Sequence, residues 1–374
     1  MSGSGLAGMS LLMRMMEEPF FDDKQILVVD KAPKQQNDRT WCFWEREQGL
    51  FEPIVHHQWQ LLDFFSKDFC TTLQIDPYCY KMIRGIDFYQ TVQRKAITKS
   101  NVHFHYEEVK SIGNENGKAV LTLPSGKISA DYIFNSILFH EPKIAAHEYM
   151  LLQHFKGWVI ETSTPVFDSG KATFMDFRVS QEEGTTFMYV LPVAANKALV
   201  EYTLFTEKLL PQEKYEEALV QYLSQYLGID SFTIEHEEFG IIPMTNHTFP
   251  SVDGRVIYIG IAGGQAKGSS GYAFQFIQKR TEAIVNSLKN NHSLHTDRSF
   301  GVKKFRLYDS VLLHVLHYKK LNGDKIFADI FRKNPPQRVL RFLDNETSLW
   351  DDLHIMNSVP TSIFLKAAIQ EIFR

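Results

Sequence analysis

Short apolar runs and helical spacing alternate along the first part of the chain. The segment Gln25–Asp30 has a continuous run of Ile, Leu and Val. Such a run predicts a buried strand of a parallel sheet that is covered on both faces. Residues 6–18 and 85–99 have the spacing of helices, and Val102–Tyr106 indicates the next strand. This succession predicts a parallel α/β layer.

The middle of the chain follows a different pattern. Pro124-Ser125-Gly126 between two apolar segments predicts a hairpin turn, and Ala130–Ile137 predicts a further strand. From about residue 156 to 245, apolar and polar residues alternate, which is typical of an antiparallel sheet. Residues 211–227 interrupt this sheet with the spacing of a helix.

The last third returns to the first pattern before it becomes helical. Residues 255–262 predict one more buried strand, which leads into glycines, and residues 272–290 predict a helix. From about residue 300 onward the chain is amphipathic with helical spacing. The α/β layer is therefore expected to be discontinuous in sequence, with the antiparallel sheet inserted into it.

Composition limits the class of protein. The chain has 374 residues, enough for two or three domains or one large two-lobed domain. Hydrophobic residues make up 44% and charged residues 22%, as in a soluble globular protein with a core. The net charge of −4 gives no electrostatic case for binding nucleic acid. The 29 Phe residues fit either a Phe-rich core or a large apolar ligand tunnel.

The cysteines and the N-terminal residues indicate the cellular compartment of the protein. Cys42, Cys70 and Cys79 are odd in number and lack Cys-x-x-Cys spacing, which favours a reducing compartment over a disulfide framework or zinc ribbon. No apolar run approaches the roughly 18 residues of a transmembrane helix. Glu17 and Glu18 are unlike the apolar core of a signal peptide. These features predict a cytoplasmic protein.

Histidine pairs do not predict a metal site. His314 and His317 have helical spacing in an apolar segment, but no carboxylate follows at the spacing of a metal ligand. We interpret them, like His56-His57, as packing or surface residues. The chain also lacks a Gly-x-Ser-x-Gly or Cys/His nucleophile signature.

A Gly-x-Gly-x-x-Gly turn opens the chain, with Gly3, Gly5 and Gly8 as its glycines. The first permits a tight turn, the second lets backbone amides approach a pyrophosphate, and the third lets the following helix pack closely. Asp30 follows about 20 residues later at a strand end, where a carboxylate accepts ribose hydroxyls. Because the sequence starts at Met1, the strand that ordinarily precedes this turn is missing. Either the start is truncated or another segment fills that place.

A second glycine-rich stretch follows the strand at 255–262 and includes Gly263, Gly264 and Gly271. Small residues allow the backbone to approach a planar ring closely. A helix that begins near Gly271 would aim its positive end at such a ring. The alternative is a plain glycine-rich loop.

Several short segments of the sequence, taken together, resemble those of a known family. They are Asp38–Trp44, Met175–Arg178, Phe187–Pro192, Leu199–Thr203, Gly240–Met244 and Gly263–Tyr272. With them, the chain resembles the bacterial lycopene β-cyclase family from Gly3 to about Ile277. The resemblance implies a flavin monooxygenase-like α/β architecture: a Rossmann-like FAD-binding domain, an inserted antiparallel-sheet substrate domain and a helical C-terminal tail. It also implies that FAD acts in its reduced form, with NAD(P)H as electron source.

The resemblance and the pattern together predict domain boundaries. We expect an FAD-binding domain at 1–45, 85–155 and 245–298. The substrate domain is expected at 46–84 and 156–244, and the helical region at 299–374.

The implied reaction has no net redox change. A linear end of lycopene is protonated, a tertiary carbocation forms, the ring closes, and loss of a ring proton leaves a β-ionone end. Reaction at both ends gives β-carotene by way of γ-carotene. Protonation of an alkene needs a carboxylic acid that stays protonated, and burial among apolar groups raises a carboxyl pKa.

The middle segments of this set supply candidate catalytic residues. Glu201 lies between Val200 and Tyr202 in an alternating strand and matches the family's acidic motif, so we predict that it is the acid or the cation stabiliser. Asp176 and Arg178 share one face of a strand as i and i+2. They are predicted either to fix Glu201 or the flavin, or to form a structural ion pair.

The remaining candidates surround the flavin and substrate. Arg39 is predicted to border the flavin. Aromatic rings attract a cation with about 1–2 kcal/mol when desolvated. The residues predicted to act in this way, or else to pack in the core, are Trp41, Trp44, Phe177 and Tyr189.

Two rival functions and one location remain open. A flavin monooxygenase shares the architecture, and a catalytically inactive carotenoid-binding protein would have lost its flavin. The tail mixes Phe, Leu and Ile with Lys and Arg at 302–330 and 361–373. This composition fits peripheral contact with the inner face of the plasma membrane, and contact with other carotenoid enzymes, or an ordinary helical cap.

Overall fold

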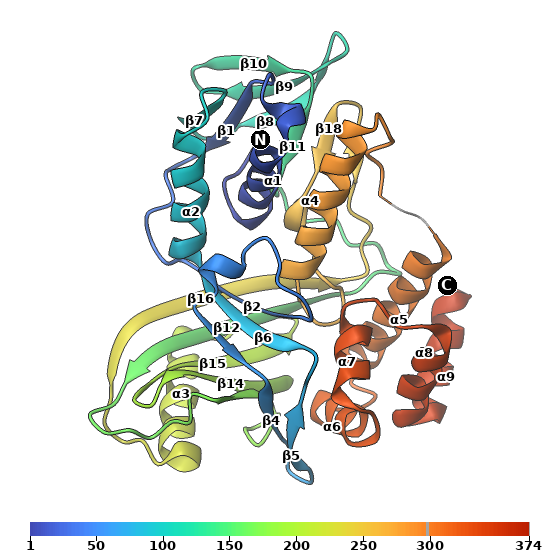
Figure 1. Cartoon of the computed structure of the whole chain (residues 1–374). Helices are drawn as coiled ribbons and strands as arrows, with labels where there is room; N and C mark the ends of the chain where they lie inside the picture. The colour runs from blue at the N-terminus through green and yellow to red at the C-terminus, as the bar shows by residue number, and fades with distance from the viewer. Residues whose placement is uncertain (297–298, 374) are drawn as a thin grey trace.

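The computed structural model describes residues 1–296 and 299–373. Figure 1 shows strands and helices from the first and last thirds of the chain stacked above a broad sheet, with the C-terminal helices packed beside that sheet. Within the described residues, none of the helices is both long enough and apolar enough to cross a membrane.

The upper layer contains two pairs of parallel strands. β1 (Ile26–Asp30) pairs with β7 (Val102–Tyr106), and β11 (Ile133–Asn135) pairs with β18 (Val256–Tyr258). Ser2 forms parallel bridges to both Val29 and Asn135 and so joins the two pairs. The first residues of the chain therefore lie between β1 and β11, and no other described strand pairs there.

Helices cover this layer. α1 (Leu6–Glu17) is apolar on nearly all sides, and Met9, Leu11 and Leu12 are completely buried. A helix with apolar residues all round must pack on every side. α1 does so against α2 (Gly85–Ile97) and α4 (Phe274–Lys289).

Two strands of the structure are shorter than the apolar segments that predicted them. In the predicted strand Ala130–Ile137, only Ile133–Asn135 belongs to β11, because Ala130 ends the hairpin strand β10 (Gly126–Ala130). The predicted strand at 255–262 ends at Tyr258. Gly260 has φ +63, which a strand cannot continue, and Gly260–Gly263 form the 3-10 turn η3.

Smaller sheets complete the upper part. β8 (Ser111–Glu115) and β9 (Lys118–Leu123) form an antiparallel sheet with β10, and β17 (Val252–Asp253) adds to β18. Two short 3-10 turns are η1 (Pro19–Phe21) and η2 (Glu52–Ile54). A separate antiparallel sheet has the order β2-β6-β3, with bounds Thr40–Glu45, Cys79–Arg84 and His57–Trp59.

The lower sheet has seven strands in the order β16-β12-β15-β14-β13-β4-β5. Their bounds are Thr233–Thr245, Met150–Glu161, Lys197–Thr206, Thr185–Ala194, Lys171–Asp176, Leu61–Phe65 and Cys70–Gln74. The pairing is antiparallel except between β13 and β4. The predicted antiparallel sheet is therefore present, and β4 and β5 extend it.

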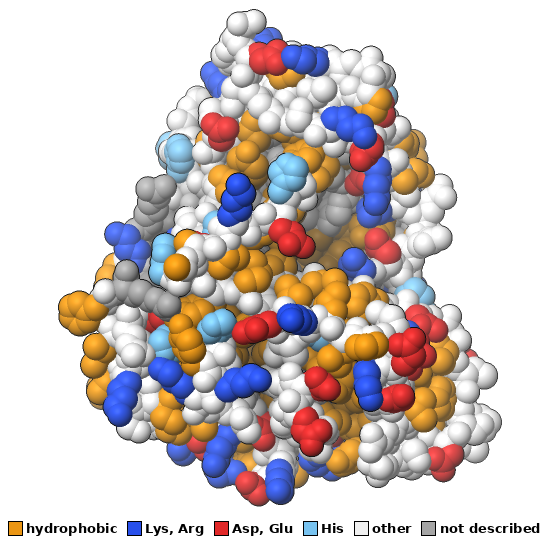
Figure 2. Space-filling model, turned by 180° about the vertical axis from the view of Figure 1, so that it is seen from behind, with side chains coloured by type: hydrophobic (Ala, Val, Ile, Leu, Met, Phe, Trp, Pro, Cys, Tyr) orange, Lys and Arg blue, Asp and Glu red, His pale blue; other side chains and the backbone are white. Residues whose placement is uncertain are grey.

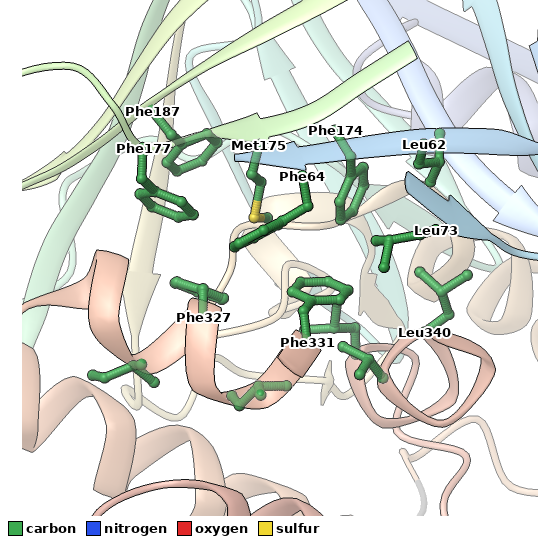
Figure 3. Packing of buried hydrophobic residues seen from close by; sticks show 14 of the residues in the cluster. Leu62, Phe64, Leu73, Phe174, Met175, Phe177, Phe187, Phe327, Phe331 and Leu340 are labelled. Carbon is green, nitrogen blue, oxygen red and sulfur yellow. The ribbon is translucent and has the colours of Figure 1, made fainter. Parts of the chain in front are cut away.

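The two faces of this sheet are buried differently. α3 (Gln212–Leu227) covers one face through Tyr215, Leu219 and Tyr222. The tail helices pack against part of the other face. They are α5 (Phe300–His317), α6 (Gly323–Lys333), α7 (Pro336–Leu343), α8 (Leu349–Ser358) and α9 (Thr361–Ile372). Figure 3 shows Phe64 and Phe174 of the sheet directed toward Phe331 of α6.

The predicted domain boundaries stay a prediction. Residues 46–84 contribute to two sheets: β4 and β5 extend the large sheet, whereas β3 and most of β6 belong to the three-stranded one. The predicted boundaries at 298 and 374 lie outside the described residues.

Candidate functional site

The three glycines of the opening turn have three different environments. Gly3 has φ +94, which favours glycine. A Cβ on Gly8 would lie 2.0 Å from the Gly3 carbonyl oxygen, so only glycine lets α1 pack this closely on the turn. A Cβ on Gly5 would meet no atom within 4 Å. The backbone at Gly5 thus borders open space at the start of α1, and no side chain caps this helix end.

The structure brings Asp30 to the same turn. The Ser4 backbone N–H and the Ser4 hydroxyl both donate to Asp30 Oδ2, each at 2.7 Å. The end of β1, the turn and the first N–H groups of α1 therefore meet at one edge of the parallel layer. Unpaired N–H groups at a helix N-terminus favour a phosphate. The residues predicted for the nucleotide site, Gly3, Gly5, Gly8 and Asp30, therefore lie together, and their ligand stays a prediction.

The second glycine stretch connects the two layers. Gly260 lies against α1, where its Cβ position is 3.0 Å from the Ala7 Cβ. At the other end, Gly271 has φ +70 and lies on the large sheet, where a Cβ would be 2.0 Å from Gln153 Oε1. The helix that follows, α4, begins at Phe274, three residues after Gly271. Close backbone approach is thus required at both ends of this stretch.

A large pocket opens beside Gly263 and Gly264, between the two ends of this stretch. It has a volume of about 1140 Å³, and Gly263, Gly264, Phe249, Arg280 and Asp344 are among its lining residues. Figure 2 shows the molecule hollowed between its upper and lower parts, with apolar side chains around the hollow. Two of the three predicted flavin glycines, Gly263 and Gly264, therefore border a space large enough for a ligand, whereas Gly271 does not line it.

Glu201 lies on the face of the large sheet opposite α3. Its neighbours Val200 and Tyr202 pack in the cluster against α3, so Glu201 points the other way. Glu201 is half-buried. The Thr203 hydroxyl donates to Glu201 Oε1 at 2.7 Å. Burial, and then the charge of Glu238, raise the pKa of Glu201 well above the ordinary glutamate range.

Glu238 is the second carboxyl group of this site. Gly157 of β12 pairs with Glu201 of β15 on one side and with Glu238 of β16 on the other. A Cβ on Gly157 would lie 3.1 Å from Glu238 Cγ, so the Glu238 side chain extends over the glycine. Glu238 is 6% exposed. Burial raises its pKa above the usual range, although hydrogen bonds from Thr40 oppose the shift.

Aromatic rings surround the carboxyl pair. Tyr189 pairs with Glu201 across β14 and β15, and its hydroxyl lies 3.3 Å from the Tyr272 hydroxyl. Trp44 packs edge-on against Tyr272, with ring centroids 4.8 Å apart. Tyr80 is buried beside Trp44, and burial raises its pKa well above the usual value. The site can therefore hold a neutral acid beside the faces and edges of electron-rich rings.

Asp176 and Arg178 are not beside Glu201. Asp176 pairs with Met188, which packs in the cluster against α3, and accepts a hydrogen bond of 2.7 Å from Tyr222 of that helix. Arg178 follows the end of β13 and donates to Asp176 through its backbone N–H and its guanidinium group. The prediction that this pair fixes Glu201 is corrected: the pair lies on the opposite face of the sheet.

The four predicted aromatic residues lie in different surroundings. Trp44 and Tyr189 lie in the aromatic surroundings of Glu201. Trp41 points the other way, toward Phe88 of α2, with ring centroids 5.1 Å apart. Phe177 stacks on Phe327 of α6, at 5.7 Å, within the core that Figure 3 shows.

Arg39 lies at the surface end of this site. It is exposed, and its guanidinium donates to the Phe239 carbonyl at 3.1 Å. Together with Asp38 and Glu238 it lines a pocket of about 550 Å³. Its charge acts on the carboxyl group of Glu238, whose pKa it lowers in part.

Sequence reasoning missed Glu238, and it gave Thr40 and Tyr272 no role in the site although both lie in segments that carry the resemblance. Because side chains alternate along a strand, Glu238 must lie on the opposite face of β16 from its neighbour Glu237. The Glu237 carboxylate forms an ion pair of 3.2 Å with Lys156. The alternation was available in the sequence, but the partner strand and its register were not. Among the described residues, no three His, Cys, Asp or Glu side chains gather as metal ligands would.

Known proteins resemble this chain over most of its length. The family model described as "Lycopene cyclase protein" matches residues 1–369. A chloroplastic/chromoplastic lycopene beta cyclase of Capsicum annuum is 26% identical over 310 residues, which are 76% of this chain and 59% of that protein. A lycopene beta-cyclase of Pantoea ananas is 25% identical over 256 residues, which are 65% of this chain and 61% of that protein.

The chain spans less than two thirds of the length of these relatives. Among solved structures, a flavin-dependent halogenase from Xanthomonas campestris superposes with a TM-score of 0.61 at 9% identity, covering 99% of this chain and 94% of the other. This likeness confirms the predicted flavin monooxygenase-like architecture. The family match over nearly the whole chain confirms the resemblance as well, and the chain belongs to the lycopene cyclase protein family.

Proposed function

We propose that this protein is a lycopene β-cyclase, which closes the linear ends of lycopene to β-ionone rings and forms β-carotene by way of γ-carotene. The observation that carries the proposal is Glu201, a carboxyl group whose pKa is raised to about 8 by burial and by Glu238. A neutral carboxylic acid near pH 7 is what protonation of an alkene requires.

The residues around Glu201 suit the steps of this reaction. Glu201 donates its proton to the terminal double bond, and the resulting tertiary carbocation is attacked by the neighbouring double bond. The ring then loses a proton to the carboxylate. Trp44 and Tyr189 present electron-rich rings to the positive charge. The aromatic side chains around the carboxyl pair also exclude water, which would otherwise react with the cation.

The opening turn would hold the cofactor of such an enzyme. The backbone at Gly5 would bind the pyrophosphate of FAD, with Gly3 and Gly8 shaping the turn that presents it. Asp30 would bind the ribose, and the second glycine stretch would approach the ring. Reduced FAD supplies an electron-rich ring that stabilises positive charge, and NAD(P)H is the proposed source of its electrons. The fit rests on the open space at Gly5, next to uncapped N–H groups.

Expression in lycopene-producing cells tests the proposal. We expect β-carotene from the unmodified protein and from the control Glu237→Gln, which changes a carboxylate on the other face of β16. Lycopene is expected from Glu201→Gln. β-Carotene from Glu201→Gln would overturn the role of Glu201, and lycopene from the unmodified protein would overturn the cyclase.

Two rival functions can be distinguished with the purified protein. Substrate-dependent oxygen uptake would identify a flavin monooxygenase, in line with the shared architecture. Purified protein that binds carotenoid but holds no flavin would identify a carotenoid-binding protein.

The proposed location is the cytoplasm, with peripheral contact at the inner face of the plasma membrane. Exposed apolar side chains on two tail helices support this contact: Leu349, Trp350 and Leu353 on α8, and Leu365, Ile369 and Ile372 on α9. Trp350 is 70% exposed. Lycopene dissolves in lipid, so an enzyme that acts on it gains from such a surface.

A further inference from the structure

Glu201 and Glu238 are close because glycine separates them. Neighbouring strands of a sheet lie about 4.8 Å apart, so residues two strands apart are ordinarily separated by about 10 Å. Here the residue between them is Gly157, and the side chain of Glu238 occupies the space above it: the Gly157 Cβ position lies 3.1 Å from Glu238 Cγ and 3.4 Å from Glu238 Oε1. That position is one strand spacing from Glu201.

One carboxyl oxygen of the pair is buried without a hydrogen-bond partner among the described residues. Thr203 donates to Glu201 Oε1, and Thr40 acts on Glu238. The oxygen in question is Glu238 Oε2, for which the described part of the chain supplies no donor. A buried carboxylate oxygen without a donor costs free energy, whereas a proton held between two carboxyl groups would satisfy it.

We propose that Glu201 and Glu238 hold a single proton between them across Gly157, and that Glu238 is a positioning residue that keeps Glu201 protonated for the reaction. This assignment rests on the proposed cyclase function. When the O–H bond of Glu201 breaks, a C–H bond forms on the substrate. When the ring later loses its proton, an O–H bond forms again on the pair. The pair ends as it began, no electrons are transferred, and no further reactant is needed.

Within residues 1–296 and 299–373, no positively charged group contributes to the pKa shift of Glu201. Cys42 of β2, Tyr80 of β6, Tyr189 of β14 and Tyr272 face it, and burial raises the pKa of each of these groups. The charges of both glutamates add to the shift at Cys42, so both carboxyl groups lie near that thiol.

Charged side chains act on the outer end of the pair, at Glu238. Asp38 and Arg39 act on Glu238 with opposite signs, and Arg39 is exposed at the surface. The positive charge of Arg39 favours the carboxylate form of Glu238 and outweighs the opposite effect of Asp38, and neither residue contributes to the pKa shift of Glu201. The arrangement therefore divides the roles: Glu201, which faces the aromatic rings, keeps the proton, and Glu238 carries the negative charge.

Infrared titration of the purified holoprotein tests the pair directly. We expect C=O absorption of protonated carboxyl groups near neutral pH, with one component lost in Glu201→Gln; Asp344, whose pKa burial also raises, contributes equally in every variant. In Glu238→Gln the Glu201 component should titrate at a pH lower by about one unit, because the neighbouring charge is gone. Glu237→Gln is the matched control and should titrate like the unmodified protein. An unshifted titration in Glu238→Gln would overturn the proposal.

A second variant covers the case in which Glu238→Gln does not fold. Gly157→Ala keeps both carboxyl groups but places a methyl group where the Glu238 side chain lies. The same downward shift is expected, and an unshifted titration would again overturn the proposal. Gly113→Ala is its control, because a Cβ on Gly113 meets no atom within 4 Å.

Pigment analysis separates this proposal from the proposed function. β-Carotene production that depends on Glu201, with an unshifted titration in Glu238→Gln, would refute the pair and leave the cyclase standing. A shifted titration in a protein that makes no β-carotene would support proton sharing and refute the cyclase.

Discussion

Glu201 and Glu238 flank Gly157 from the two neighbouring strands, on the face of the large sheet that is turned away from α3. Since Gly157 has no side chain, the two carboxyl groups reach a common space that Trp44 and Tyr189 border. Two acids in such surroundings cannot both ionise near neutral pH without a large electrostatic cost.

The pair makes stability depend on pH. The pKa of Glu201 is raised from 4.5 to about 8, so between these values the folded state holds a proton that the unfolded state has released. Stability should therefore fall as pH rises through this window and then level off. Urea unfolding at about pH 6 and about pH 9 measures the difference. Glu201→Gln should reduce it, and Glu237→Gln should not. An equal fall in all three proteins would refute the prediction.

Gly5 and Gly8 should respond differently to alanine. Gly5→Ala meets open space, so we expect a stability loss below about 1 kcal/mol, the usual range for a cap position. Its methyl group would intrude where phosphate is expected, so FAD affinity should fall at least about tenfold, or about 1.4 kcal/mol. Gly8→Ala should instead destabilise the fold by at least about 1–3 kcal/mol. Flavin titration and thermal melting separate the two effects, and full FAD retention in Gly5→Ala would contradict the assignment.

Asp176 should matter for stability rather than for chemistry. Asp176→Ala leaves Arg178 and Tyr222 without their shared partner. Breaking a fully buried pair costs about 3–5 kcal/mol, and we expect about 2–3 kcal/mol because the Arg178 side chain is 31% exposed. Chemical denaturation measures the loss. The pH profile of cyclisation per folded molecule should stay unchanged, and a moved profile would restore a catalytic role.

For comparison, Glu217→Ala removes an exposed ion pair with Lys214 on the same helix, α3. Its effect on unfolding should stay below about 0.5 kcal/mol. A similar loss in both variants would mean that the Asp176 network is no stronger than a surface pair.

The exposed faces of α8 and α9 predict lipid binding. Trp350→Glu and Leu365→Glu should each reduce the share of protein that floats with liposomes, because each replaces an exposed apolar side chain by a charge. Ile97→Glu on α2 is the matched control, since Ile97 is 84% exposed but lies on another part of the molecule. Equal flotation of all variants would count against docking through the tail.

The sequence alone determined the features that depend on local chemistry. The apolar run of β1, the helical spacing of α2 and α3, and the turn with Gly3, Gly5 and Gly8 each follow from neighbouring residues, because strand and helix periods and positive φ are local properties. The choice of Glu201 came from a motif rather than from geometry. Strand ends were less well predicted, as at Tyr258, where Gly260 turns the chain.

Only the tertiary structure decided which side chains meet. Side chains alternate along a strand, so the face on which a residue lies depends on register and on bulges, and these are set by partner strands far away in sequence. This is why Asp176 lies against α3 although it was expected beside Glu201. It is also why Glu238, unremarkable in its own segment, becomes the second acid: β12 lies between β15 and β16, with Gly157 in register with both glutamates.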